Sequence, residues 1–161
     1  MPDAPDPGAP DPDATLAELG AQLAVHVRAA VPAWVTRCVE ERLAPDAAGR
    51  DAVMADAEDA GRAAADAVAA ALATLLAAPV DAQWSTPLEI VRGAVSYPTA
   101  VLVAAGVAPS RRDRFDQERF PEDLFGLTPA SLEALDPSLA EPGIAWGAAK
   151  AFAHRRRHGG R

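Results

Sequence analysis

Apolar residues recur one helical turn apart through the first quarter of the chain. Between Thr15 and Pro45 this spacing predicts a helix that buries one side, formed by Leu16, Leu19, Leu23, Val27, Val31, Trp34 and Cys38. Thr15 and Glu18 have the spacing of a capping box, so we expect the helix to begin at Thr15. Pro32 has no backbone donor, which predicts either a kink near residue 28 or a break into two helices.

A second helix is predicted over residues 46–78, ending before Pro79. Its apolar side is built mainly of small residues, namely Val53, Ala57, Ala60, Ala64, Val68, Ala71 and Leu75. Its acidic residues are interpreted as a solvated face, because catalytic carboxylates must converge and be buried: Asp51, Asp56, Glu58, Asp59 and Asp66. The two helices together predict an antiparallel helical hairpin over residues 14–78.

The pattern changes at Trp84, because seven of the eight aromatic residues lie from there on. Thr86-Pro87-Leu88-Glu89 combines a capping box with proline at the first helical position, so a helix is predicted to begin there and to bury Leu88, Val91 and Val95. We therefore expect residues 84–157 to form an aromatic-rich helical half, with the well-specified core and any site within residues 84–152.

Shorter elements are predicted in the rest of that half. Residues 110–119 suggest an amphipathic helix anchored by Phe115, and Thr128 before Pro129 suggests a second threonine cap. Asp136-Pro137 predicts a turn or short helix. A final helix is expected from about residue 142 to 157, ended by the glycines at 159 and 160.

Composition supports one helical domain over residues 14–157. Alanine supplies 40 of the 161 residues, and alanine is the best helix former, so the predicted class is all-α: an irregular helical bundle in which the hairpin packs with several shorter helices. Residues 1–13 are acidic and proline-rich and predict a disordered tail, and residues 158–161 predict a flexible one.

Charge and cysteine content limit the binding partners and the cellular location that we expect. A net charge of −8 opposes general binding to nucleic acid or to an anionic membrane, and the longest uncharged stretches are too short or too polar for a membrane helix. The N-terminus lacks a signal-peptide pattern, so we expect a cytoplasmic protein. Cys38 is the single cysteine, so no intramolecular disulfide can form, and its place on the apolar stripe predicts an inert core thiol.

Motifs for chemistry are weak. His154 and His158 have the spacing of a helical metal pair, but three arginines lie between them and no third ligand is placed by the sequence, so no metal site or cofactor is predicted. Nucleotide and acyl-transfer motifs are absent from the sequence, which favours a non-catalytic protein without deciding the question.

Two groups of polar residues remain as candidate sites. Glu89, Arg92 and Tyr97 lie beside apolar residues on the best-specified helix, where Glu89 and Arg92 can pair, and they predict either a structural network or the lining of a ligand pocket. Residues 150–161 carry a formal charge of +5, so Lys150, Arg155, Arg156 and Arg157 are candidate contacts to nucleic acid or to an acidic partner.

Three segments carry a resemblance: Trp84-Ser-Thr-Pro-Leu-Glu, Leu127-Thr-Pro-Ala-Ser-Leu and Glu141-Pro-Gly-Ile-Ala-Trp-Gly-Ala-Ala-Lys150. On these the chain resembles small uncharacterised alanine-rich proteins of high-GC actinobacteria. The resemblance covers roughly the second half and implies a bacterial cytosolic setting. No activity is established for that group, so it carries over no functional residues.

Three functions follow as hypotheses. The first is a non-catalytic protein-interaction protein, with self-association as its simplest form. The second is association with nucleic acid or the ribosome through the basic C-terminal residues. The third is an enzyme or small-ligand binder built around Glu89, Arg92 and Tyr97, which requires those groups to converge on a cleft.

Overall fold

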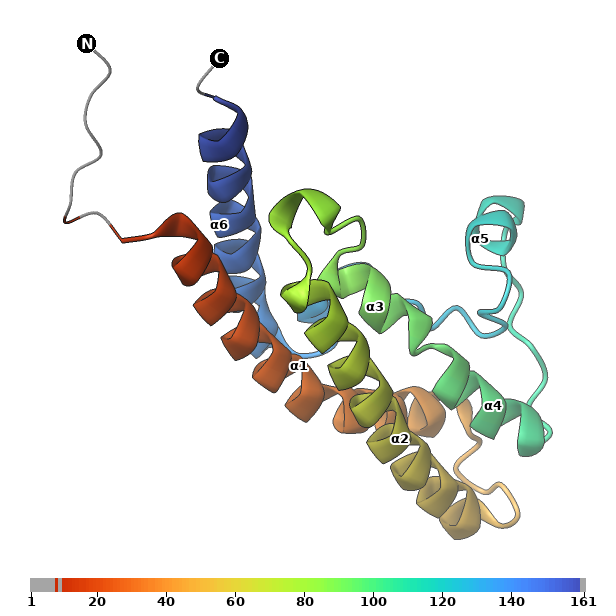
Figure 1. Cartoon of the computed structure of the whole chain (residues 1–161). Coiled ribbons are helices and arrows are strands. Elements are labelled where there is room, and N and C mark those ends of the chain that lie inside the picture. Colours follow the sequence, from red (N-terminus) through yellow and green to blue (C-terminus); the bar gives the residue numbers. More distant parts are fainter. Residues whose placement is uncertain (1–7, 9, 160–161) are drawn as a thin grey trace.

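The computed structural model describes residue 8 and residues 10–159 of the chain. Every regular element in those ranges is helical, which confirms the all-α class. In chain order the elements are α1 (Pro12–Arg42), α2 (Arg50–Ala77), η1 (Val80–Ala82), α3 (Pro87–Gly93), α4 (Ser96–Ala104), α5 (Arg114–Arg119), η2 (Leu132–Ala134), η3 (Pro137–Leu139) and α6 (Ala140–His158). The predicted irregular bundle with an N-terminal hairpin is therefore present (Figure 1).

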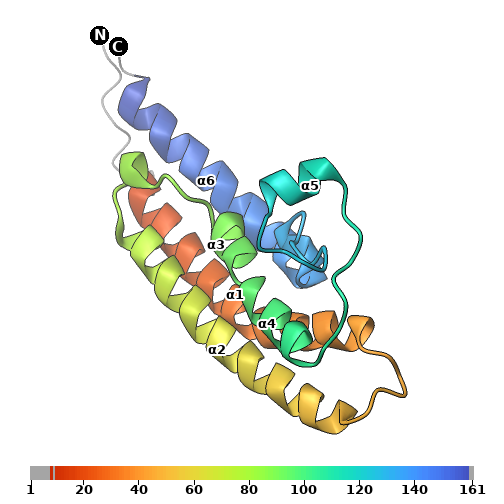
Figure 2. The ribbon, with the colours of Figure 1, turned by 90° about the vertical axis from the view of Figure 1, so that its right-hand side faces the viewer.

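The hairpin of α1 and α2 is the centre of the molecule. Helix α1 lies between α2 and α6 (Figure 2), and α3 and α4 pack against the hairpin. The predicted stripe on α1 is confirmed, since six of its seven residues are buried and Leu19 is half-buried against the core. The 3.6-residue period alone fixed that face.

The start of α1 differs from the prediction. The helix begins at Pro12 after the N-cap Asp11, whose carboxylate accepts a hydrogen bond from the Asp13 backbone N–H. The expected cap at Thr15 was wrong, because Asp11 with proline at the next position forms an equally good helix start one turn earlier. The remainder of the predicted N-terminal tail, residues 1–7 and 9, lies outside the described residues, as do Gly160 and Arg161.

Pro32 lies inside α1 without breaking it. The helix is continuous from Pro12 to Arg42, and its axis bends in the last third (Figures 1 and 2). A Cβ on Gly61 of α2 would lie 3.0 Å from both Cα and the carbonyl oxygen of Pro32. The two helices therefore touch backbone to backbone at the proline, which only a glycine permits.

Helix α2 begins at Arg50 rather than at residue 46, because Gly49 before it adopts a left-handed backbone with φ of +71°. Its buried side largely follows the prediction, although Leu72 is buried in place of Ala71. Among the described helices, α2 is the one with the length and apolar composition to cross a membrane. A helix of a hydrophobic core meets the same criteria, and the buried side of α2 packs along α1.

The aromatic residues predicted a core within residues 84–152, and this prediction was wrong. Helices α1 and α2 supply most of the buried apolar side chains, whereas Trp84 and Phe115 are 89% and 66% exposed. Phe115 therefore does not anchor α5. Of the seven aromatic residues from Trp84 on, Phe125 and Trp146 are buried. Aromatic residues gathered in one segment do not mark the core, because burial depends on which elements pack against them.

The capping box at Thr86 is confirmed in full. The Thr86 hydroxyl accepts from the Glu89 N–H at 3.3 Å, and the Glu89 carboxylate accepts from the Thr86 N–H at 3.0 Å. Pro87 occupies the first turn of α3, as predicted. Val91 and Val95 are buried, and Leu88 is half-buried at the surface.

Thr86→Ala is expected to lower the free energy of unfolding by about 1 kcal/mol, because α3 loses its N-cap. Urea unfolding followed by circular dichroism measures this change. Thr15→Ala is the matched control, since Thr15 lies within α1 and caps no helix. A larger loss in Thr15→Ala than in Thr86→Ala would contradict this assignment of the caps.

Residues 120–135 have little regular structure apart from η2, and the segment is held by charged side chains. The buried carboxylate of Asp123 accepts hydrogen bonds from the N–H groups of Phe125, Leu127 and Thr128 and from the Thr128 hydroxyl. The sequence suggested that Thr128 caps a helix at Pro129. Thr128 instead binds Asp123, so this prediction was wrong. Four arginines donate to backbone carbonyls of the same segment: Arg37, Arg42, Arg92 and Arg112.

The other predicted elements of this half are present. Asp136 caps η3 by accepting from the Ser138 N–H at 2.8 Å, which confirms the turn expected at Asp136-Pro137. Helix α6 runs from Ala140 to His158 and ends at Gly159. His158, placed by prediction in the flexible tail, is the last residue of this helix.

Candidate functional site

An apolar groove of about 460 Å³ lies between α3, η2 and the first half of α6. Residues of three chain segments line it: Thr86, Pro87, Leu88, Ser131, Leu132, Glu133, Leu139, Ala140, Gly143, Ile144, Trp146 and Gly147. Of these, Glu133 is the one ionisable side chain. The described lining thus offers a surface for apolar contact and no pair of groups for acid–base or nucleophilic chemistry.

The floor of the groove is fixed by buried side chains. Leu139 is fully buried and Trp146 is 5% exposed. The indole nitrogen of Trp146 lies 3.3 Å from where a Cβ on Gly20 of α1 would be, so the polar edge of the ring faces α1. That nitrogen is shielded from water, so it adds no accessible polar group to the groove.

Close packing of η2 against α6 shapes one wall. A Cβ on Gly143 would lie 3.0 Å from Cδ1 of Leu132, so glycine at this position lets the two elements approach. The lining includes one large apolar side chain that is exposed, Ile144, at 74% exposure. A large aliphatic side chain in water at an apolar groove is typical of a contact surface.

Trp84 lies two residues before the groove residue Thr86 and is the most exposed of the large apolar side chains. Its backbone is held in place, because the Trp84 N–H donates to Ala82 O at 3.1 Å. The neighbouring Gln83 carbonyl accepts from Nζ of Lys150 at 3.0 Å. The sequence indicated an anchor of the core here, and only the tertiary structure shows that the indole is left in water.

The three residues suggested as a ligand site have separate roles in the structure. Glu89 closes the capping box, and Arg92 donates to the carbonyls of Pro129 and Ala130 at 3.1 and 3.2 Å. Tyr97 is half-buried against the core. Within the described chain no hydrogen bond or ion pair joins Glu89, Arg92 and Tyr97 to one another, so the pairing of Glu89 with Arg92 is not formed.

The basic residues of α6 divide into two groups. Lys150 binds the Gln83 carbonyl and lies over the Trp146 ring, 5.2 Å from its centroid. Arg157 pairs with Asp13 at 2.8 Å and with Asp81 at 3.7 Å. Arg155 and Arg156 are exposed, and neither has an ion-pair partner among residues 10–159.

Cys38 is buried, as predicted from the apolar stripe. Burial raises the pKa of its thiol to about 11, and the nearby cation Arg37 offsets only part of that effect. The thiol is therefore protonated at neutral pH and is a poor nucleophile. The acidic residues of α2 are exposed, which confirms the solvated face; Asp66 pairs with Arg28 and Asp59 with Arg62.

Asp81 of η1 lies beside His154 and His158 near the end of α6. The sequence suggested the two histidines as neighbours but gave no signal for the carboxylate, which is 73 residues from His154 by subtraction of their numbers. The three side chains are exposed.

Comparison with known proteins was made for the whole chain. No model of a protein family matches it, and no curated protein and no solved structure is significantly similar to it.

Proposed function

We propose that this chain is a non-catalytic, cytosolic bacterial protein-interaction protein that self-associates through the groove between α3, η2 and α6. The observation that carries the proposal is an apolar groove lined by the exposed Ile144, together with the more exposed Trp84, which lies two residues before the groove residue Thr86 in the chain. The free energy falls when another surface removes exposed apolar groups of this size from water. The groove lining lacks paired catalytic groups, which favours binding over chemistry.

A second copy of the chain suits this surface. In a two-fold dimer the same patch is used by both subunits, so a protruding residue of one copy meets the recess of the other. The chain carries both a highly exposed tryptophan, Trp84, and an apolar recess, which is the combination that a two-fold contact needs. Tryptophan is also among the residues that contribute most to binding at interfaces.

Sedimentation velocity across protein concentration tests the proposal. The mass is expected to rise from 16.6 kDa toward twice that value as concentration increases. Trp84→Ala is expected to weaken the dimer on the order of tenfold or more, because it removes a large buried contact. Ile144→Glu is expected to act in the same direction, since dimer formation would bury a charge.

Phe115→Ala is the matched control, because Phe115 is an exposed aromatic residue on α5 that does not line the groove. Its dimer dissociation constant should equal that of the wild type. The proposal is wrong if the full chain stays monomeric at every concentration, or if Trp84→Ala and Ile144→Glu associate as tightly as the wild type.

Salt separates self-association from the nucleic-acid hypothesis. Two copies with a net charge of −8 repel each other, so screening should strengthen an apolar contact between them. Binding of Arg155 and Arg156 to phosphates would weaken steeply as salt rises. Lys150 and Arg157 already bind groups of the same chain, Gln83 O and Asp13. This supports self-association over binding of nucleic acid by these residues.

A further inference from the structure

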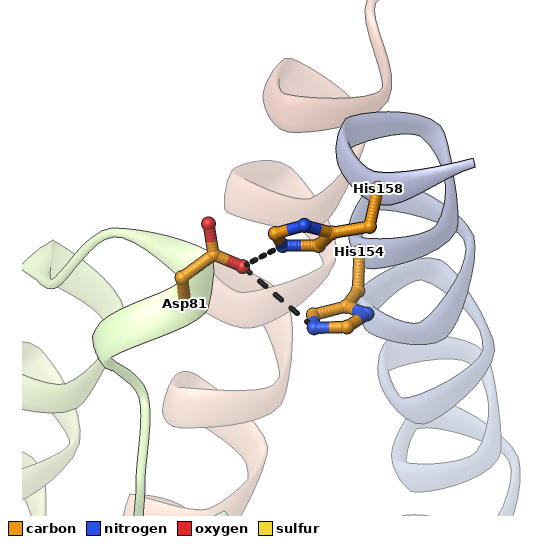
Figure 3. Close-up of side chains that lie close together, drawn as sticks. All are labelled: Asp81, His154 and His158. Carbon is orange, nitrogen blue, oxygen red and sulfur yellow. Dashed lines mark hydrogen bonds and ion pairs between the residues drawn. The ribbon is translucent and has the colours of Figure 1, made fainter. Parts of the chain in front are cut away.

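Asp81, His154 and His158 bring three metal-ligating atoms to one place on the surface. Figure 3 shows both imidazoles pointing from α6 toward the carboxylate of Asp81 on η1. Nε2 of His158 lies 3.0 Å from Oδ1 of Asp81, and Nε2 of His154 lies 3.8 Å from the same oxygen. One ligand atom from each residue falls within 4.8 Å of the other two.

Two features of the fold create this arrangement. The histidines are four residues apart near the end of a helix, so both rings leave the same face, with centroids 4.5 Å apart. The turn after α2 then places η1 beside the end of α6, and Asp81 lies in that turn. The chain thus supplies an i, i+4 histidine pair from one element and a carboxylate from another.

These ligand types and spacings fit a divalent transition metal. Zn²⁺ binds imidazole nitrogen and carboxylate oxygen at about 2.0–2.2 Å, so two ligand atoms of a tetrahedral site lie about 3.4 Å apart. The observed separations of 3.0 and 3.8 Å from Oδ1 of Asp81 lie on either side of that value. Small side-chain rotations at exposed positions would place all three atoms around one ion.

A neighbouring cation opposes the binding of a metal ion at these three residues. Nη1 of Arg157 lies 3.7 Å from Oδ2 of Asp81, and this cation competes with a metal for the carboxylate. Nη2 of the same guanidinium lies 2.8 Å from Oδ2 of Asp13, which offsets part of its charge. Oδ1 of Asp81, the atom nearest the imidazoles, is not the oxygen that faces Arg157.

We propose that Asp81, His154 and His158 form a binding site for one divalent transition-metal ion, with Zn²⁺ as the best-suited ion. Three protein ligands leave a fourth position for water or for a ligand from another molecule. The bound ion connects η1 to the end of α6. It stabilises the folded chain because binding to the native state shifts the unfolding equilibrium.

Isothermal titration calorimetry of the chelator-treated full chain with Zn²⁺ tests the site. Binding of one ion per chain is expected, together with a rise in Tm. Co²⁺ is the spectroscopic probe, because tetrahedral coordination gives it strong visible absorption. His154→Ala, His158→Ala and Asp81→Asn are each expected to weaken Zn²⁺ binding on the order of tenfold or more, since each removes one ligand.

His26→Ala is the matched control, because His26 is the remaining histidine of the chain and lies exposed on α1, outside the cluster. Its affinity for Zn²⁺ should equal that of the wild type. The three ligands are 57%, 57% and 46% exposed at their side chains, so their replacement leaves the core intact, and circular dichroism verifies this. The proposal is overturned if no saturable binding occurs, or if the histidine variants bind as tightly as the wild type.

Discussion

Gly61→Val is expected to lower the free energy of unfolding by about 3 kcal/mol, because the new side chain must enter a backbone contact. The Cβ alone would lie 3.0 Å from Cα and from the carbonyl oxygen of Pro32, and neither atom can move without displacing α1. Valine is a better helix former than glycine, so helix propensity works against the loss. Urea unfolding followed by circular dichroism measures the difference.

The control for this prediction is the same substitution at Gly93. That glycine also lies within a helix, α3, but nothing is within 4 Å of the position of its Cβ, and it does not line the groove. Gly93→Val should leave the stability unchanged or raise it by a few tenths of a kcal/mol, about the difference in helix propensity. Equal stabilities of the two variants would show that α1 and α2 do not touch at Pro32 in solution.

Asp123→Asn is expected to lower the free energy of unfolding by about 3 kcal/mol, because an isosteric amide replaces one of two acceptor oxygens in a buried site. The Asp123 carboxylate accepts four hydrogen bonds, two of them at 2.7 Å from the N–H and hydroxyl of Thr128. An amide group that keeps its oxygen toward Phe125 and Leu127 would turn a donor toward these two donors of Thr128. Denaturant unfolding at neutral pH measures the loss.

The pH dependence of this loss gives a second test of the same group. Burial raises the pKa of Asp123, but the hydrogen bonds from Leu127, Thr128 and Phe125 outweigh it and hold the pKa below its ordinary value. A lowered pKa in the folded state means that the charged form contributes stability above the unfolded pKa of about 3.9. That contribution is lost as the pH falls through the folded pKa. The difference in stability between wild type and Asp123→Asn should therefore shrink in acid.

Asp136→Asn is the comparison for Asp123→Asn. Its carboxylate also accepts from a backbone N–H, that of Ser138, but the group is exposed to water. Its replacement should cost less than that of Asp123, because water satisfies the groups left behind. An equal loss in the two variants would contradict the role assigned to the buried carboxylate.

Local patterns in the sequence determined the helical class, the buried stripe of α1 and the capping box at Thr86. Each depends on residues within one or two turns of one another, so the residues that interact are neighbours in the sequence. The pair His154 and His158 was visible for the same reason. The competing start of α1 at Asp11 is also local, and it shows that two adequate caps in one stretch cannot be ranked by pattern alone.

The tertiary structure alone decided which surfaces are free and which distant groups meet. Packing of the helices left Trp84 exposed. It also brought together groups that are far apart in the chain, namely Gly61 with Pro32 and Asp81 with the two histidines. The sequence by itself therefore determined that this protein is a bundle of helices with a hairpin at its start. Its groove and its candidate metal ligands come from packing, because side chains on different helices become neighbours only when the helices do.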